Sequence, residues 1–140
     1  MRYLIDTCIF VYLATDYTRI SKDVREIIKD YDSVLYISAE SVKELVLAYK
    51  TKGLCAKRWK TPFELINAIE NEFFINIIPL KKEHLQTYAK LQTDENHGHK
   101  DPSDHIIISQ AITEKIPLIS SDLRFGFYEK QGLDFILNVK

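Results

Sequence analysis

Short apolar runs of β-strand character alternate along the chain with stretches of helical period, and this alternation constrains the fold more than any other feature. The runs are rich in β-branched and aromatic residues and are too short for helices. Strands separated by helices pair in parallel through right-handed crossovers. The sequence therefore predicts a three-layer α/β/α domain around a central, mainly parallel sheet of about five strands. The predicted strands are Tyr3–Ile5, Val34–Ile37, Phe74–Ile78, Leu118–Ile119 and Phe135–Leu137.

Helical segments fill the intervals between these strands. Apolar residues recur at i, i+3, i+4 and i+7 over Val24–Tyr31 and Val42–Tyr49, and more weakly over Leu85–Gln92. Thr61-Pro62 and Asp101-Pro102 each place a proline at the first helical position, where its missing N–H would be unpaired anyway. The most polar stretch, residues 93–100 (TDENHGHK), is predicted to be a surface loop.

Length and composition bound the class of protein. The 140 residues fit one domain, and neither an internal repeat nor a Gly/Ser linker divides them, so we expect a single domain over 1–140. The apolar runs are far shorter than the roughly 20 residues that cross a bilayer, and the first residues do not read as a secretory signal. Cys8 and Cys55 show no paired spacing. The sequence predicts a soluble, cytoplasmic protein with no membrane partner.

The net charge of −1 argues against coating nucleic acid by bulk charge, but one local run is strongly basic. Residues 50–60 (KTKGLCAKRWK), the basic segment, contain no acid. One interpretation is a solvated helix end and loop. The other interpretation is a phosphate-binding segment with an aromatic ring on which a base could stack. Under that second interpretation the contact candidates are Lys50, Lys52, Lys57, Arg58, Lys60 and Trp59.

Four acidic residues occupy the positions where a parallel sheet builds its ligand site. Asp6 and Asp122 directly follow predicted strands, Asp104 lies in the first turn of the helix opened by Asp101-Pro102, and Glu44 lies early in a helix after a strand. Ligands of open parallel sheets bind outside the carboxyl ends of the strands. The sequence therefore predicts that these acids converge at one edge.

Each acid also has an ordinary structural explanation. Asp6, Asp101 and Asp122 could be helix N-caps. Glu44 lies about 160° from the apolar stripe of its helix, which fits plain solvent exposure. As a set, however, crowded carboxylates repel, and a divalent cation relieves that cost. Hard oxygen ligands suit Mg²⁺ or Mn²⁺, and such an ion activates water and stabilises charge on phosphoryl oxygens, as phosphodiester hydrolysis requires.

Two further groups of residues allow a chemical interpretation. His97-Gly98-His99 together with His105 could form a transition-metal site, although two histidines in a polar loop are a loose signal without a cysteine or a third ordered ligand. Cys8 could be a nucleophile, but no nearby base is indicated, and a small buried thiol is the simpler interpretation.

Four segments, LIDTCIFVY, ISAESVKEL, HKDPSDHIIISQA and PLISSDLRF, together resemble the PIN-domain family of metal-dependent ribonucleases. Within that family the chain is most similar to the VapC-like toxins of prokaryotic type II toxin–antitoxin pairs. The resemblance extends from Leu4 to Phe125. It implies a PIN-like fold, an endoribonuclease that uses Mg²⁺ or Mn²⁺, an RNA substrate, a homodimer, and an antitoxin whose C-terminal segment covers the acidic groove.

The resemblance also implies roles for individual residues. The catalytic and metal-binding acids would be Asp6, Glu44, Asp104 and Asp122. Thr7 and Ser120 match hydroxyls that help to position the metal shell, and Asp101 matches the first acid of the signature Asp-Pro-Phe-Asp-Arg. Ser103 replaces the Phe of that signature and His105 replaces its Arg, which bears on substrate choice more than on chemistry.

Two other functions remain open at this stage. A phosphatase of the haloacid dehalogenase type also begins with an Asp after the first strand, but it requires Asp-x-Asp, whereas Asp6 is followed by Thr7-Cys8. A non-catalytic PIN-fold module could bind RNA or a protein partner, because a fold by itself does not prove activity.

Overall fold

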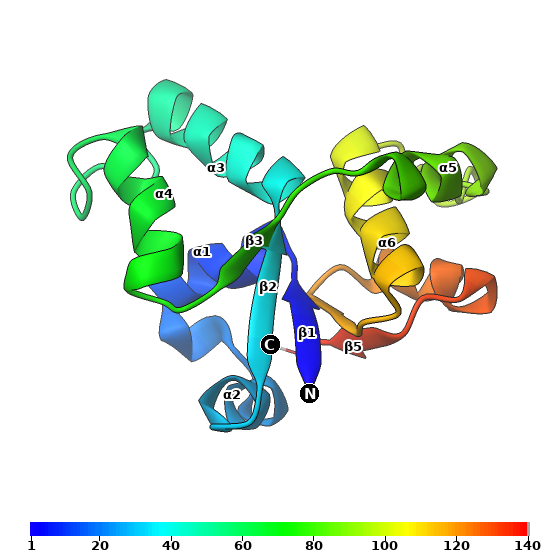
Figure 1. Ribbon diagram of the computed structural model, residues 1–140, viewed down its shortest axis with the longest axis horizontal. Coiled ribbons are helices and arrows are strands. Elements are labelled where there is room, and N and C mark those ends of the chain that lie inside the picture. The colour runs from blue at the N-terminus through cyan, green and yellow to red at the C-terminus, as the bar shows by residue number, and fades with distance from the viewer. Residues whose placement is uncertain (140) are drawn as a thin grey trace.

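All five strands of the central sheet run parallel, in the spatial order β3-β2-β1-β4-β5 (Figure 1). The computed structural model describes residues 1–139, and it confirms the predicted α/β/α layering. The strands are β1 (Arg2–Ile5), β2 (Val34–Ser38), β3 (Asn76–Ile78), β4 (Leu118–Ser120) and β5 (Phe135–Leu137). The helices are α1 (Thr7–Thr15), α2 (Lys22–Lys29), α3 (Ala39–Lys52), α4 (Pro62–Asn71), α5 (Lys82–Lys90) and α6 (Pro102–Glu114), with the 3₁₀ segments η1 (Tyr17–Arg19) and η2 (Leu123–Gln131).

Alternation of side chains along the strands builds two hydrophobic cores, one on each face of the sheet. Ile5 of β1 belongs to the core that α1, α2, α3 and α4 cover, whereas the preceding Leu4 belongs to the core that α6 and η2 cover. Neighbouring strands follow the same rule, with Ile119 on the first face and Leu118 on the second. Successive side chains of a strand point to opposite faces, so apolar runs of this kind need helices on both sides.

The strand order fixes where a ligand site can form. From the central β1 the chain first builds outward through β2 and β3, and later adds β4 and β5 on the other side of β1. The crossover direction therefore reverses between β1 and β4, and the carboxyl ends of these two strands flank the crevice at that switch point. Asp6 and Asp122 lie immediately beyond those ends.

Both predicted proline-led helix starts are present. Thr61 caps α4 by accepting from the backbone N–H of Glu64, and Asp101 caps α6 by accepting from that of Ser103. The region before β3 differs from the expectation. Phe74 is not in a strand; it has a left-handed φ of 56° and is 78% exposed, so β3 begins only at Asn76.

The polar stretch 93–100 is a loop and lies largely on the surface, as predicted, but two of its residues are buried. Asp94 is 3% exposed and His99 is 1% exposed. The backbone N–H of Asp94 donates to the Tyr128 hydroxyl at 3.2 Å, and that hydroxyl lies 3.0 Å from Nδ1 of His99. Polar residues are buried here because they satisfy one another's hydrogen bonds.

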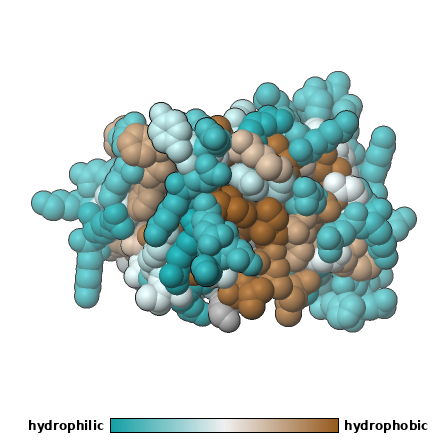
Figure 2. Space-filling model, turned by 90° about the horizontal axis from the view of Figure 1, so that it is seen from below, coloured by the Kyte–Doolittle hydropathy of each residue, from teal (hydrophilic) through white to brown (hydrophobic). Residues whose placement is uncertain are grey.

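The opposite end of the sheet, where the strands begin, has a different surface. Met1 and Val34, at the starts of β1 and β2, are exposed apolar residues. Figure 2, the view from below, shows hydrophobic side chains gathered in the middle of that face between hydrophilic flanks. Within residues 1–139, no helix has the length and apolar character needed to cross a bilayer.

Candidate active site

Asp6 is held rigidly at the end of β1. Its Oδ1 accepts the backbone N–H of Thr7 at 2.7 Å, and its Oδ2 accepts the hydroxyl of Ser120 at 2.7 Å. The residue is 6% exposed, and burial raises the pKa of its carboxyl above the ordinary value despite these hydrogen bonds. The N-cap interpretation is correct for Asp6, since it begins α1, but the cap accounts for only one of its two oxygens.

Glu44 turns toward this site and away from open solvent. It lies in the second turn of α3, half-buried, and its Oε1 accepts the hydroxyl of Thr7 at 2.8 Å. Thr7 therefore connects two of the predicted acids, one through its backbone and one through its side chain. Burial raises the pKa of Glu44, and nearby Asp101 and Asp6 raise it further. Solvent exposure does not describe this residue.

Asp122 caps η2 and is partly neutralised by Arg124. Its two carboxylate oxygens accept from the Arg124 guanidinium, with Nη2 to Oδ2 at 2.8 Å and Nε to Oδ1 at 3.1 Å. Burial alone would raise the pKa of Asp122, but hydrogen bonds and charge from Arg124 outweigh it and lower the pKa. Ser120 connects this segment to β1, because its hydroxyl accepts the backbone N–H of Asp122 and donates to Asp6.

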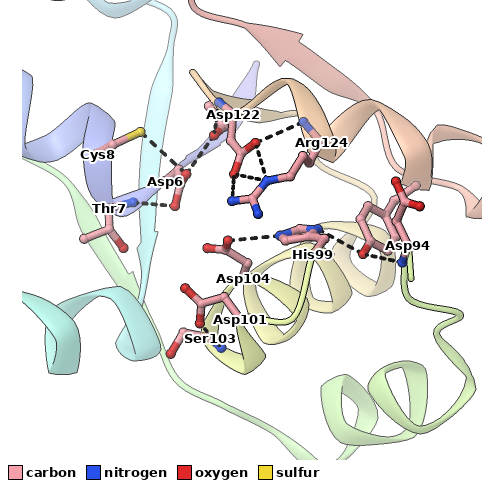
Figure 3. A network of polar contacts seen from close by, with 12 residues as sticks. Asp6, Thr7, Cys8, Asp94, His99, Asp101, Ser103, Asp104, Asp122 and Arg124 are labelled. Atoms are coloured by element: carbon pink, nitrogen blue, oxygen red, sulfur yellow. Dashed lines mark hydrogen bonds and ion pairs between the residues drawn. The ribbon is translucent and has the colours of Figure 1, made fainter. Parts of the chain in front are cut away.

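Asp104 is influenced by the charges of all the other predicted acids. Burial raises its pKa to about 8, and the charges of Asp6, Asp101, Glu44 and Asp122 raise it in the same direction. Its Oδ2 lies 3.0 Å from Nε2 of the buried His99 (Figure 3). Its neighbours thus include all three of the other predicted acids, and they make its ionised form unfavourable.

These donors fit a divalent cation. One ligand atom each from His99, Asp104 and Asp122 lie within 4.8 Å of one another, which is the spacing of groups that share an ion. Asp6 and Glu44 lie outside this tightest group but act electrostatically on Asp104. A cation held here would offset the repulsion that raises the pKa of Asp104.

The start of α6 is tied to the start of α3 across the site. Asp101 is exposed, and one of its carboxylate oxygens caps α6 by accepting the backbone N–H of Ser103. Ser103, which stands where the resemblance expects Phe, donates its hydroxyl to Oε1 of Glu40 at 2.9 Å. Lys43 donates to the same oxygen at 2.6 Å. At the position where the resemblance expects Phe, Ser103 therefore forms a polar bridge between α6 and α3.

Of the four histidine and cysteine candidates, two contact the carboxylates of the site: His99 pairs with Asp104, and the Cys8 thiol donates to Oδ2 of Asp6 at 3.6 Å. His97 is exposed and pairs with Asp94 at 2.6 Å. His105 is buried, with its ring 4.8 Å from that of His99. Burial raises the pKa of the Cys8 thiol to about 12, with the charge of Asp6 adding to the effect. Such a thiol is not a nucleophile near neutral pH, in agreement with the simpler interpretation.

In the basic segment, the prediction that Trp59 offers a stacking surface is wrong. Trp59 is 7% exposed and packs edge-on against Phe73, with ring centroids 6.1 Å apart. Arg58 covers the Trp59 ring at 4.8 Å and is paired with Glu72. Four lysines of the segment remain exposed and stay candidates for phosphate contact: Lys50, Lys52, Lys57 and Lys60.

Sequence reasoning missed His99, Arg124 and Tyr128 as parts of this site. His99 precedes α6 by only three residues, and that proximity to Asp101-Pro102 was an available signal. Arg124 lies two residues after Asp122, also close enough to have been considered. Nothing in the sequence shows that the Tyr128 hydroxyl reaches the loop, since that contact depends on how η2 packs.

Comparisons with known proteins agree with this geometry. The sequence model of the PIN domain family matches residues 3–131. The fold is similar to the structure of VapBC2 from Rickettsia felis bound to a promoter DNA fragment (TM-score 0.67, 20% identity, covering 98% of this chain and 97% of the other). It is also similar to VapBC-1 from nontypeable Haemophilus influenzae (0.66, 20%, 100% and 100%) and to a toxin–antitoxin complex from Klebsiella pneumoniae (0.63, 16%, 99% and 98%). A search of curated proteins found no match.

The parallel five-stranded sheet and the helices that cover its two faces form a PIN-like fold. The chain belongs to the PIN domain family, because the family match covers nearly its whole length. The similar solved structures, all far below 25% identity, support the fold and come from toxin–antitoxin systems.

Proposed function

We propose that this protein is a metal-dependent endoribonuclease and the toxin of a type II toxin–antitoxin pair. The observation that carries the proposal is the electrostatic state of the site. Acids from four separate elements gather at one end of the sheet, and the pKa values of Asp6, Glu44 and Asp104 are all raised, chiefly by burial. A surface used only for binding has no need to sustain that repulsion, whereas a cation site does.

Mg²⁺ or Mn²⁺ would be held by Asp104 and Asp122, with Asp6 and Glu44 beside it directly or through water. When bound, such an ion lowers the pKa of water and stabilises negative charge on phosphoryl oxygens. Asp6 keeps one orientation because Thr7 and Ser120 fix both of its oxygens. Thr7 donates to Oε1 of Glu44, and the other oxygen of that carboxylate would accept a proton from the water that attacks the phosphate.

The RNA backbone would approach along positive groups near this site. Arg124 is 45% exposed at its side chain and lies at the rim of the carboxylate cluster. The exposed lysines of the basic segment would add phosphate contacts farther along the strand. A charge-based contact of this kind carries little sequence information, so it would position RNA without selecting the cleavage site.

Partners follow from the similar structures in the same proposal. Because similar structures are toxin–antitoxin complexes, we propose an antitoxin protein as the partner of this chain. The resemblance to VapC-like toxins further implies that the antitoxin would cover the acidic site and that the chain would form a homodimer. Size-exclusion chromatography with light scattering tests the homodimer, with twice the 16.4 kDa chain mass expected and a monomer mass contradicting it.

RNA cleavage with controlled metal tests the activity. The purified protein is stripped with EDTA and mixed with a fluorescent single-stranded RNA, or with DNA of the same sequence. We expect internal cuts in the RNA only after Mg²⁺ or Mn²⁺ is restored, and no cuts in the DNA. Cleavage that continues in EDTA would rule out the metal role. An inert protein that still binds RNA would favour the non-catalytic module.

A further inference from the structure

The side chain of His99 lies in the carboxylate cluster, although His99 is not one of the predicted acids. Its Nε2 lies 3.0 Å from Oδ2 of Asp104, and one ring nitrogen lies within 4.8 Å of a ligand oxygen of Asp122. In Figure 3 the ring stands between Asp94 and the Asp104 carboxylate. An imidazole in this place changes the donor set from oxygen only to mixed nitrogen and oxygen.

The ring of His99 is held in one orientation. It is 1% exposed and stacks on Phe125, with centroids 5.6 Å apart and planes 28° apart. Its Nδ1 lies 3.0 Å from the Tyr128 hydroxyl, whose oxygen also accepts the backbone N–H of Asp94. With Nδ1 engaged on one side, only Nε2 faces the acids.

The position of Nε2 matches that of a metal ligand. Two donors on adjacent corners of an octahedral ion, each about 2.1 Å from it, stand about 3.0 Å apart, which is the separation of Nε2 from Asp104 Oδ2. An ion on Nε2 leaves the proton on Nδ1, which then donates to the Tyr128 oxygen. Histidines that bind metals are usually fixed through their second nitrogen in this way.

We propose that Nε2 of His99 is a ligand of the ion held by Asp104 and Asp122, and that this nitrogen makes the site prefer Mn²⁺ over Mg²⁺. The inference rests on the proposed function, because the same ion would serve the nuclease. Imidazole binds transition ions well, whereas Mg²⁺ favours oxygen and retains its water. Asp122 joins the ion when Arg124, which is half-exposed, releases it.

A different role for His99 makes a different prediction. If Nε2 only donates a hydrogen bond to Asp104, the histidine is a positioning residue and never touches the ion. Replacing it would then weaken Mg²⁺ and Mn²⁺ binding by the same factor. A direct ligand instead changes the ratio of the two affinities, and it leaves a nitrogen signature on the bound ion.

Pulsed electron paramagnetic resonance of the protein loaded with Mn²⁺ alone tests the inference without RNA or cleavage. We expect electron spin echo modulation from an imidazole ¹⁴N in the wild type, its loss in His99→Gln, and its retention in His97→Gln. His97 is the matched control, because it is a histidine of the same loop with an exposed side chain. Titrations should show Mn²⁺ binding weakened about tenfold in His99→Gln, with Mg²⁺ binding weakened less.

The outcomes separate this inference from the proposed function. Mn²⁺ that binds the wild type without a ¹⁴N signal overturns the His99 ligand and leaves the nuclease intact. A protein that binds neither ion overturns both. The absence of a ¹⁴N signal in the wild type overturns the His99 ligand even if His99→Gln does not fold, and loss of the signal in His97→Gln would assign the nitrogen to His97 instead.

Discussion

The acidic site and the basic segment are the two charged features that the sequence singles out, and the fold arranges them in opposite ways. The acids come from four distant elements, and the fold partly buries them together at the ends of β1 and β4. The basic residues are neighbours in sequence, and the fold disperses them. Arg58 covers the core residue Trp59 and pairs with Glu72, while the lysines extend into solvent.

This difference separates charge that costs stability from charge that does not. Burying carboxylates beside one another is unfavourable, so it persists only where something else offsets the cost, and in the proposed function that is a cation. A contiguous lysine run needs no such compensation, because each side chain remains hydrated. Convergence of like charges across the fold is therefore the stronger indication of chemistry.

The largest expected effect is loss of cleavage in Asp6→Asn. The change is nearly isosteric and keeps an acceptor for Thr7, so the fold should remain. We expect RNA cleavage to fall about 100-fold or more, because a fixed anionic group is lost from the site. Asp16→Asn, which alters an exposed cap of η1 away from the site, is the control and should cleave normally. Wild-type cleavage by Asp6→Asn would remove that residue from the mechanism.

Trp59→Ala should act on stability instead. Removing a buried aromatic from the core costs about 3–5 kcal/mol of unfolding free energy, measured by urea denaturation. Lys57→Ala, a solvated position in the same segment, should stay within roughly 0.5 kcal/mol of the wild type. If Trp59→Ala were stable but failed to bind RNA, the stacking interpretation of Trp59 would return.

The pH dependence of the metal-free protein should reveal the raised pKa of Asp104. Its pKa of about 8 in the folded state lies above the unfolded value near 3.9, so the folded state keeps a proton that the unfolded state loses. Stability from this group is therefore lost as pH rises from about 4 to about 8. Three pKa units correspond to about 4 kcal/mol, so in EDTA we expect Tm to fall by roughly 10 °C between pH 5 and pH 8.5, and Asp104→Asn to flatten that decline. An equal decline in the variant would contradict the raised pKa.

The smallest expected effect concerns Arg124, the positively charged side chain that pairs with Asp122. Arg124 occupies both oxygens of Asp122, so it competes with a metal ion for them. Arg124→Gln removes that competing charge and should tighten Mn²⁺ binding by roughly three- to tenfold in calorimetric titration. Arg19→Gln, which removes a guanidinium that lies over the Tyr12 ring, should not. Weaker binding in Arg124→Gln would mean that the guanidinium supports the metal-binding geometry.

Most of the fold could be predicted from the sequence. Apolar runs such as Val34–Ile37 and Phe135–Leu137 lie in strands, and both proline-led helix starts are correct. The failures are local. At Phe74 a left-handed turn overrides β propensity, because the neighbouring Phe73 takes the buried place against Phe10, with ring centroids 5.2 Å apart. The sequence pattern does not indicate which of the two phenylalanines packs into the core.

The acidic residues of the candidate site could be predicted from the sequence, but the contacts that set their charge states could not. Position after a strand was enough to propose Asp6 and Asp122, because parallel strands deliver their carboxyl ends to one edge. The contribution of His99 depends on a loop packing against Tyr128, and the pairing of Asp122 with Arg124 depends on side-chain direction. Contacts of that kind follow from tertiary packing, which composition and period do not encode.

A Mn²⁺ titration followed by thermal unfolding tests most directly whether the acids form a cation site. The stripped wild type should gain several degrees in Tm, since an ion at about 100 times its Kd adds about 2.7 kcal/mol to folding stability. Asp104→Asn should gain little or nothing from the same titration. A wild-type Tm that does not respond to Mn²⁺ or Mg²⁺, or an equal gain in the variant, would contradict the account.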